Sequence, residues 1–142
     1  MKKLAIGVAM LGLVGCSYET VPPAAKGKIL SGNGYSVDVK ETGKYMLPWW
    51  HNMVILDTST QRFSEKIVVK MKDNLDLPFS LDFRTRIHGS DDVINAMFQD
   101  ITHQNYKVTL ESVYSVYGKN VVTNAARSVM GKYRVNEVAA NF

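Results

Sequence analysis

The sequence predicts an α+β fold in which an antiparallel-rich, twisted N-terminal sheet is followed by packed helices. Two patterns lead to this prediction. Between Lys26 and His88 the residues are those of strands and turns, whereas from Ser90 onward apolar residues recur at helical spacing. A length of 142 residues with 46% hydrophobic content is enough for one domain with a packed core. We therefore expect one domain that changes from strands to helices near His88.

The N-terminal segment predicts export. Lys2 and Lys3 precede Leu4 to Gly15, an uncharged and mostly apolar run that is shorter than the roughly 20 residues needed to cross a bilayer. A short basic region before an apolar run of this size is typical of a secretory signal peptide. Residues 1–15 are therefore predicted to be a signal peptide.

Cys16 is the only cysteine of the chain, and Leu13-Val14-Gly15-Cys16 resembles the bacterial lipobox. The resemblance implies cleavage between Gly15 and Cys16, a diacylglycerol on the Cys16 sulfur, and an N-acyl chain such as palmitate on the new amino group. Several acyl chains, at about 0.8 kcal/mol per buried methylene, would anchor the protein durably. No cofactor besides this covalent lipid is expected. The alternatives are an ordinary signal peptide with an incidental cysteine, or an uncleaved hydrophobic anchor.

The resemblance to the lipobox implies a location in a bacterial cell envelope, facing the periplasm. Ser17 favours the outer membrane if the host is Gram-negative, since an aspartate after the cysteine is the common inner-membrane retention signal. Residues 16–25 are expected to be a lipidated tether, because Pro22-Pro23 bars a helix and favours extended chain. Residues 26–142 then form the domain.

Four segments between Lys26 and His88 predict strands. The clearest runs from Leu75 to His88, where apolar and polar residues alternate, so that one face should be buried and the other exposed. Pro78 lies on the polar side and lacks an N–H, which indicates an edge position or a bulge. The other segments are GKIL (27–30), NMVILD (52–57) and QRFSEKIVVKMK (61–72), with a turn expected at Lys72–Asn74.

The helical part begins after Ser90-Asp91-Asp92, residue types that favour a helix N-terminus. A second helical pattern covers residues 109–133, with a kink expected at Gly118, and a last turn starts at Val135. The apolar stripe of the first helix consists of Val93, Ile94, Met97, Phe98 and Ile101.

Residues 25–142 resemble the SPFH domain, also called band 7, of stomatin, prohibitin and flotillin. The resemblance rests on the order of the parts rather than on one motif. KGKIL starts the sheet close to the membrane anchor, and ETGKYMLPWW is similar to the family's hairpin that ends in Pro-Trp. The remaining parts are paired long strands in VILDTSTQRFSEKIVVKMKDNLDLPFSLDFRTRI, an acid-capped helix in SDDVINAMFQDI, and a helix with spaced Arg, Tyr and Glu in VVTNAARSVMGKYRVNEV.

The resemblance implies a membrane-anchored, non-catalytic scaffold that forms homo-oligomers and organises other envelope membrane proteins or lipid. The chain departs from the family in two ways. A lipidated Cys16 would replace the usual hydrophobic hairpin or transmembrane helix. The family's further strand and long coiled coil are not found before Phe142, so the domain is expected to be truncated at its C-terminal end, which argues against large rings. A monomeric binding or inhibitory envelope lipoprotein, for example a phage-encoded exclusion factor, is the alternative.

The residues predict no catalytic, metal or nucleic-acid site. His51, His88 and His103 lack the spacing of metal ligands, and no second cysteine accompanies them. Asp76 and Asp82 lie about 20 Å apart along one strand, too far for an acid–base pair. Without its two N-terminal lysines the chain has 15 basic and 13 acidic residues, too small an excess to indicate nucleic-acid binding.

Trp49 and Trp50 form the one aromatic cluster with a functional interpretation. A pair of tryptophans close to a lipid anchor suits the interface of a bilayer. Because successive strand residues face opposite ways, we expect one indole to be buried under the sheet. The other would then be free to contact the membrane interface.

Overall fold

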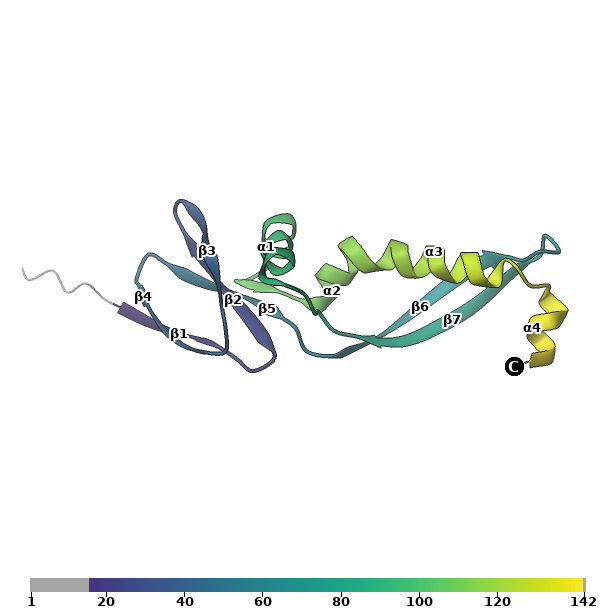
Figure 1. The fold of residues 1–142 in the computed structure, drawn as a ribbon, viewed down its shortest axis with the longest axis horizontal. Coiled ribbons are helices and arrows are strands. Elements are labelled where there is room, and N and C mark those ends of the chain that lie inside the picture. The colour runs from purple at the N-terminus through teal and green to yellow at the C-terminus, as the bar shows by residue number, and fades with distance from the viewer. Residues whose placement is uncertain (1–15, 142) are drawn as a thin grey trace, which may run out of the picture.

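The computed structural model describes residues 16–141, so the predicted signal peptide and Gly15 lie outside the described residues. The molecule is elongated (Figure 1). Strands β1 to β5 occupy one end, and a two-stranded ribbon with a long helix occupies the other. An antiparallel-rich strand region therefore precedes C-terminal helices, and the predicted α+β fold is confirmed.

The strand-rich end contains two small sheets. A two-stranded antiparallel sheet pairs β1 (Cys16–Val21) with β4 (Gly43–Pro48). A four-stranded sheet has the order β3-β2-β5-β8, in which only β8 runs parallel to its neighbour. Its strands are β2 (Ala25–Ser31), β3 (Gly34–Lys40), β5 (Asn52–Asp57) and β8 (Lys107–Val108).

The tether expected over residues 16–25 is corrected by β1. Cys16–Val21 forms a strand of the domain, and Ala25 already belongs to β2. Exposed and less exposed side chains alternate along β1 and end at Val21, which is fully buried. Pro22-Pro23 occupies only the connection between the two strands, where a residue without an N–H costs no ladder hydrogen bond.

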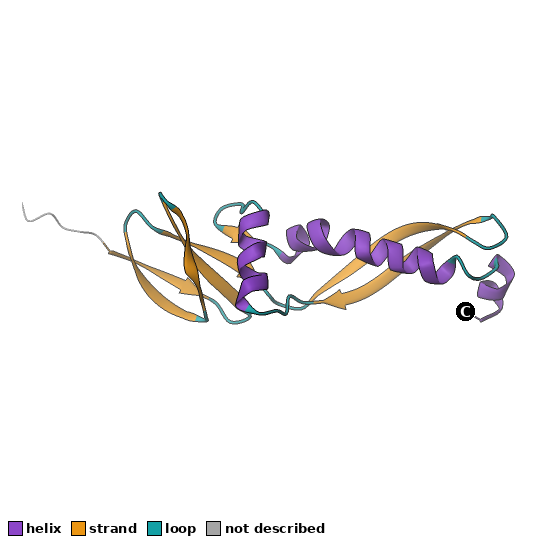
Figure 2. Cartoon of the chain, turned by 45° about the horizontal axis from the view of Figure 1, so that its top comes forward, coloured by secondary structure: helices purple, strands orange, loops and turns teal. Residues whose placement is uncertain are grey.

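The ribbon consists of β6 (Gln61–Lys70) and β7 (Asp76–Thr85), paired antiparallel without a register shift. Exposed and less exposed side chains alternate along both strands, as the sequence predicts for residues 75–88, and the turn expected at Lys72–Asn74 connects the two strands. Pro78 lies in a strand with no outer neighbour in the described chain, in agreement with the expected edge position. One face of the ribbon packs against helix α3 through Ile67, Val69, Met71, Ala126 and Met130 (Figure 2).

The helices follow the predicted spans closely. Helix α1 (Asp91–Asp100) begins after Ser90, although the Ser90 side chain makes no capping hydrogen bond. Helix α2 (Leu110–Val113) is followed by a π-helical turn, η1 (Tyr114–Gly118), and by α3 (Lys119–Met130). The irregularity expected at Gly118 is therefore a π-helical turn inside one helical segment. Helix α4 (Val135–Asn141) ends the described chain.

The main core lies between the four-stranded sheet and helices α1 and α2. Phe98 of α1 is 1% exposed, and Tyr35 of β3 contacts its ring with centroids 5.7 Å apart. The other buried members are Val54, Leu56, Ile87, Ile94, Ile101, Val108, Leu110 and Val113. A separate, smaller core lies under β1 and β4, and it determines where Cys16 is held.

Candidate membrane-contact surface

The register of β1 and β4 places Cys16 beside the tryptophan-containing turn. Cys16 lies directly opposite Pro48, and Trp49 follows at once in the chain. Cys16 is exposed. Cys16, the residue predicted to carry lipid, is therefore paired with the residue that directly precedes the two tryptophans.

Trp49 and Trp50 form the centre of a tight turn between β4 and β5. The His51 N–H donates to the Pro48 carbonyl over 2.9 Å, which closes a four-residue turn. The indole rings meet edge to face, with centroids 5.5 Å apart and planes at 86°. This turn presents both rings on the surface.

The expectation that one indole is buried is wrong. Trp49 is 69% exposed and Trp50 is 51% exposed. The expectation assumed that both residues belong to a strand, in which successive side chains face opposite ways. β4 ends at Pro48, so the alternation ends before Trp49, and the turn places both rings in solvent.

Two further apolar side chains extend this surface along the strands. Tyr18 and Met46 are paired across β1 and β4, and they are 73% and 62% exposed. Residues directly opposite in an antiparallel pair share a face, and so do residues two apart along a strand. Tyr18 and Met46 therefore lie on the same face as Cys16. We call these three residues, together with the exposed Trp49 and Trp50 of the turn that follows Pro48, the contact face.

The opposite side of these strands is buried, which fixes the orientation of the contact face. Val21 and Leu47 point away from it into a small core with Ala25 and Met53. β1 crosses close to β2 here, because a Cβ atom on Gly27 would stand 2.5 Å from Val21 Cγ2. The absence of a side chain at Gly27 thus permits β1 to pack at this distance.

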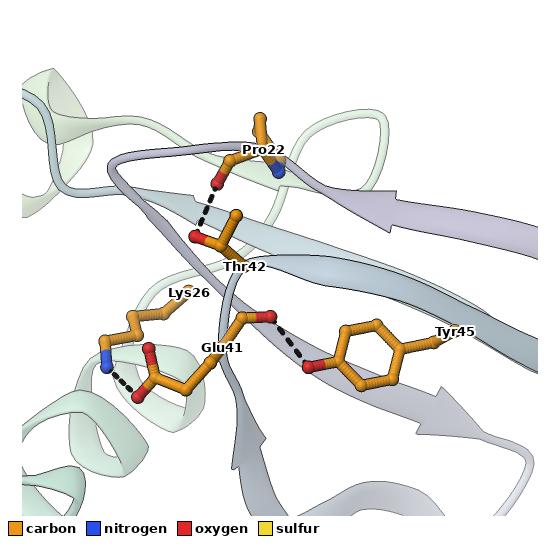
Figure 3. Close-up of polar contacts among 5 residues, drawn as sticks. All are labelled: Pro22, Lys26, Glu41, Thr42 and Tyr45. Atoms are coloured by element: carbon orange, nitrogen blue, oxygen red, sulfur yellow. Dashed lines mark hydrogen bonds and ion pairs between the residues drawn. The ribbon is translucent and has the colours of Figure 1, made fainter.

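Hydrogen bonds from the β3–β4 connection hold the two sheets together, as Figure 3 shows. The Thr42 hydroxyl donates to the Pro22 carbonyl over 3.3 Å, and the Tyr45 hydroxyl donates to the Glu41 carbonyl over 2.8 Å. Lys26 of β2 forms an ion pair with the Glu41 carboxylate. The Pro22 segment, expected to be free tether, is therefore bonded to the domain.

No group of three or more potential metal ligands is found among residues 16–141. His51 lies beside Trp50, His103 lies between Tyr35 and Tyr106, and His88 is exposed. In a cavity of about 300 Å³, the Ser112 hydroxyl donates to a backbone carbonyl rather than to a base.

No helix in the described part of the chain is long and apolar enough to cross a membrane.

Sequence reasoning found three of the five members of the contact face and missed Tyr18 and Met46. The signal was weak, because CSYETV alternates only approximately and GKYMLP has three apolar residues in succession. Each segment is short, and only the pairing of β1 with β4 brings the two side chains together.

The comparisons with known proteins support the resemblance seen in the sequence. The family model described as "SPFH domain / Band 7 family" matches residues 19–142. A search of curated proteins finds no match to this chain. The matched region begins inside β1, which agrees with the inclusion of this strand in the domain.

Proposed function

The chain belongs to the SPFH domain / band 7 family, and from this premise we propose that it is a non-catalytic, lipid-anchored scaffold of a bacterial envelope membrane. Domains of this family typically associate with membranes and oligomerise, and the family is generally non-enzymatic. The proposal adds how this chain reaches the membrane and which part of it faces the lipid.

The observation that carries the membrane part is the position of Cys16 opposite Pro48 in the β1–β4 register. A diacylglycerol on this sulfur would bring the adjoining contact face against the bilayer surface. Tryptophan and tyrosine are the residues most enriched at the membrane–water interface, because their rings are apolar and carry one polar group. The exposed rings of Trp49, Trp50 and Tyr18 fit that environment.

The anchor is short in this arrangement. Cys16 is itself the first residue of β1, so no free linker separates the proposed lipid from the folded domain. A lipid attached this close restricts how the domain can turn, and the contact face then sets its orientation. Two signals, acyl chains and an interfacial surface, make attachment more durable than either alone.

The scaffold part rests on family membership and on the elongated shape. Helix α4 and the far end of the ribbon lie opposite the beginning of β1 (Figure 1). A domain held at Cys16 would project these elements into the periplasm, where other copies and envelope membrane proteins can reach them. Ser17 after the cysteine supports an outer-membrane location if the host is Gram-negative, under the sorting pattern described above.

The proposal is tested with the full-length chain expressed in a Gram-negative bacterium. Membrane partitioning and the mass of the detergent-solubilised protein are compared for the natural chain and Cys16→Ala, with Thr20→Ala as the control. Thr20 lies on the same exposed face of β1 and carries no predicted modification. We expect a discrete oligomer that is firmly membrane-bound in the natural chain and in Thr20→Ala, and much more weakly membrane-bound in Cys16→Ala, where only the exposed aromatic rings remain to contact lipid.

Two results would change the proposal. Membrane attachment of Cys16→Ala that is as strong as that of the natural chain would contradict the lipid anchor. A monomer whose attachment depends on Cys16 would contradict the scaffold and would favour the monomeric binding or inhibitory lipoprotein.

A further inference from the structure

The ribbon of β6 and β7 has two unpaired edges. Each strand is ten residues long, and neither has an outer neighbour among the described residues. At about 3.3 Å per residue each edge presents roughly 33 Å of backbone whose outward N–H and C=O groups are open to pairing, except that Pro78 of β7 has no N–H. Long open edges are rare in folded proteins because they recruit other strands.

The solvent face of the ribbon separates charge by strand. Exposed Arg62, Lys66 and Lys70 follow one another along β6, and we call them the basic column. Exposed Asp76 and Asp82 lie on β7, and we call them the acidic column; Arg84, near the end of β7, is the exception. Both columns lie on the face opposite α3.

Most of these charges have no ion-pair partner among the described residues. Arg62 and Asp82 form an exposed ion pair with an N–O distance of 3.5 Å. For Lys66, Lys70 and Asp76 the described chain provides no ion pair within 4 Å. Half or more of each column is therefore available to a charged neighbour.

Building on the self-association proposed above, we propose that copies of this chain join edge to edge, β6 of one copy against β7 of the next. The occupant of each edge is a second copy because the ribbon is complementary to itself: one edge is basic and the other is acidic. β6 and the neighbouring β7 would run antiparallel, as they do within one ribbon. This is a head-to-tail contact, which closes into a ring when the rotation between copies allows it.

The middle of the ribbon supports the same arrangement. Val68 is 57% exposed and lies opposite Pro78 within one copy. If neighbouring ribbons keep this register, Val68 of one copy lies beside Pro78 of the next, flanked by the charged columns. An apolar centre between charged flanks is the usual composition of a specific protein interface.

The charges also select this pairing over the alternatives. Two β6 edges would bring Lys66 and Lys70 against the same lysines of another copy, and two β7 edges would bring aspartates together. Like charges across an interface suppress the wrong partner.

Two charge-reversal variants of the full chain test the proposal. Lys66→Glu/Lys70→Glu makes both columns acidic, and Asp76→Lys/Asp82→Lys makes both columns basic. Each variant alone should need at least about a tenfold higher concentration to assemble than the natural chain. Mixing the two should restore assembly, because every β6 edge again meets a β7 edge of opposite charge.

The mixture distinguishes charge contacts between copies from charge contacts within a copy. Each variant in the mixture still carries like charges on both strands of its own ribbon, so restored assembly can come only from opposite charges on neighbouring copies. The variant that carries all four changes restores opposite charges both within and between copies, and it should also assemble. Lys107→Glu/Lys132→Glu, which reverses two lysines outside the ribbon, is the control for the change in net charge. Analytical ultracentrifugation in detergent measures assembly, and circular dichroism checks the fold.

The outcomes distinguish this proposal from the function on which it rests. If either reversal assembles like the natural chain, the ribbon edges are not the interface, although self-association stands. If the variants fold but neither the mixture nor the fourfold variant assembles, the columns do not face each other. A natural chain that stays monomeric at all concentrations would overturn both the interface and the proposed scaffold.

Discussion

Gly118 and Tyr114 lie so close that a Cβ atom on Gly118 would stand 2.5 Å from Tyr114 Cδ2. The Tyr114 ring cannot easily move away, because its centroid lies 4.5 Å from that of Phe63 and 5.6 Å from that of Phe83. The π-helical turn thus joins the helical segment to the base of the ribbon through these rings. Glycine at position 118 makes this close approach possible.

Gly118→Ala should therefore destabilise the protein by about 1–3 kcal/mol, the usual cost of inserting a methyl group into a packed site. In an ordinary helix interior the same change would stabilise by roughly 1 kcal/mol, so the sign of the effect is diagnostic. Urea denaturation measures the change in the free energy of unfolding. Gly32→Ala, where a Cβ meets no atom within 4 Å, is the matched control and should not destabilise.

Gly27→Ala should loosen β1. The new Cβ would lie 2.5 Å from Val21 Cγ2 and 2.8 Å from Met53 Sδ, so the strand that begins at Cys16 must shift outward. We expect a loss of about 1–3 kcal/mol and faster hydrogen exchange in β1 and β4 than in the ribbon.

Adding Val21→Ala to Gly27→Ala removes the methyl group that clashes. The double variant should lose less stability than the sum of the two single changes predicts, because neighbouring sites couple. Additive losses, or uniform exchange throughout the molecule, would show that Gly27 does not determine the position of β1.

Lys28 of β2 predicts a pH dependence of stability. Its side chain is 2% exposed, its ammonium donates to Asn95 Oδ1 and lies 5.8 Å from the centroid of the Tyr35 ring, and burial lowers the pKa of the amine. No carboxylate forms an ion pair with it in the described chain. The folded state therefore releases the Lys28 proton at a lower pH than the unfolded state does.

Between the lowered pKa and the ordinary value of 10.5, the unfolded state binds more protons, so this group's contribution to stability rises with pH. Lys28→Met removes the contribution. The stability of the natural chain relative to Lys28→Met should rise by up to about 1.4 kcal/mol per pH unit in that window. A pH-independent difference between the two chains would contradict the lowered pKa.

The contact face predicts membrane partitioning without lipid. Residues 17–142 carry no acyl chain, and their binding to liposomes should depend on the exposed Trp49 and Trp50 rings. Replacing both by alanine should reduce the partition coefficient by at least about fivefold, measured by co-sedimentation. Val37→Ala, an 86% exposed apolar side chain on β3, is the control, and equal partitioning of all three proteins would argue against interfacial contact.

Much of the fold could be predicted because its patterns are local. The alternation in β7 and the apolar stripe of α1 can be recognised from the residues of one element alone. The strands at residues 52–57 and 61–70 could likewise be predicted from the residues of each segment. Three members of the candidate site, Cys16, Trp49 and Trp50, could also be named, although the exposure of both indoles could not be predicted. Their exposure depends on where β4 ends, and turns are decided by contacts outside the local pattern.

The sequence by itself determined the order of strands and helices, the family resemblance, and the single cysteine behind an apolar leader. Only the tertiary structure decided that Cys16–Val21 is a strand of the domain, because its partner β4 begins more than twenty residues later in the chain. The burial of Lys28 and the two open edges of the ribbon were decided in the same way. Periodicity shows which face of an element is apolar, whereas pairing and burial depend on which distant segments pack against it.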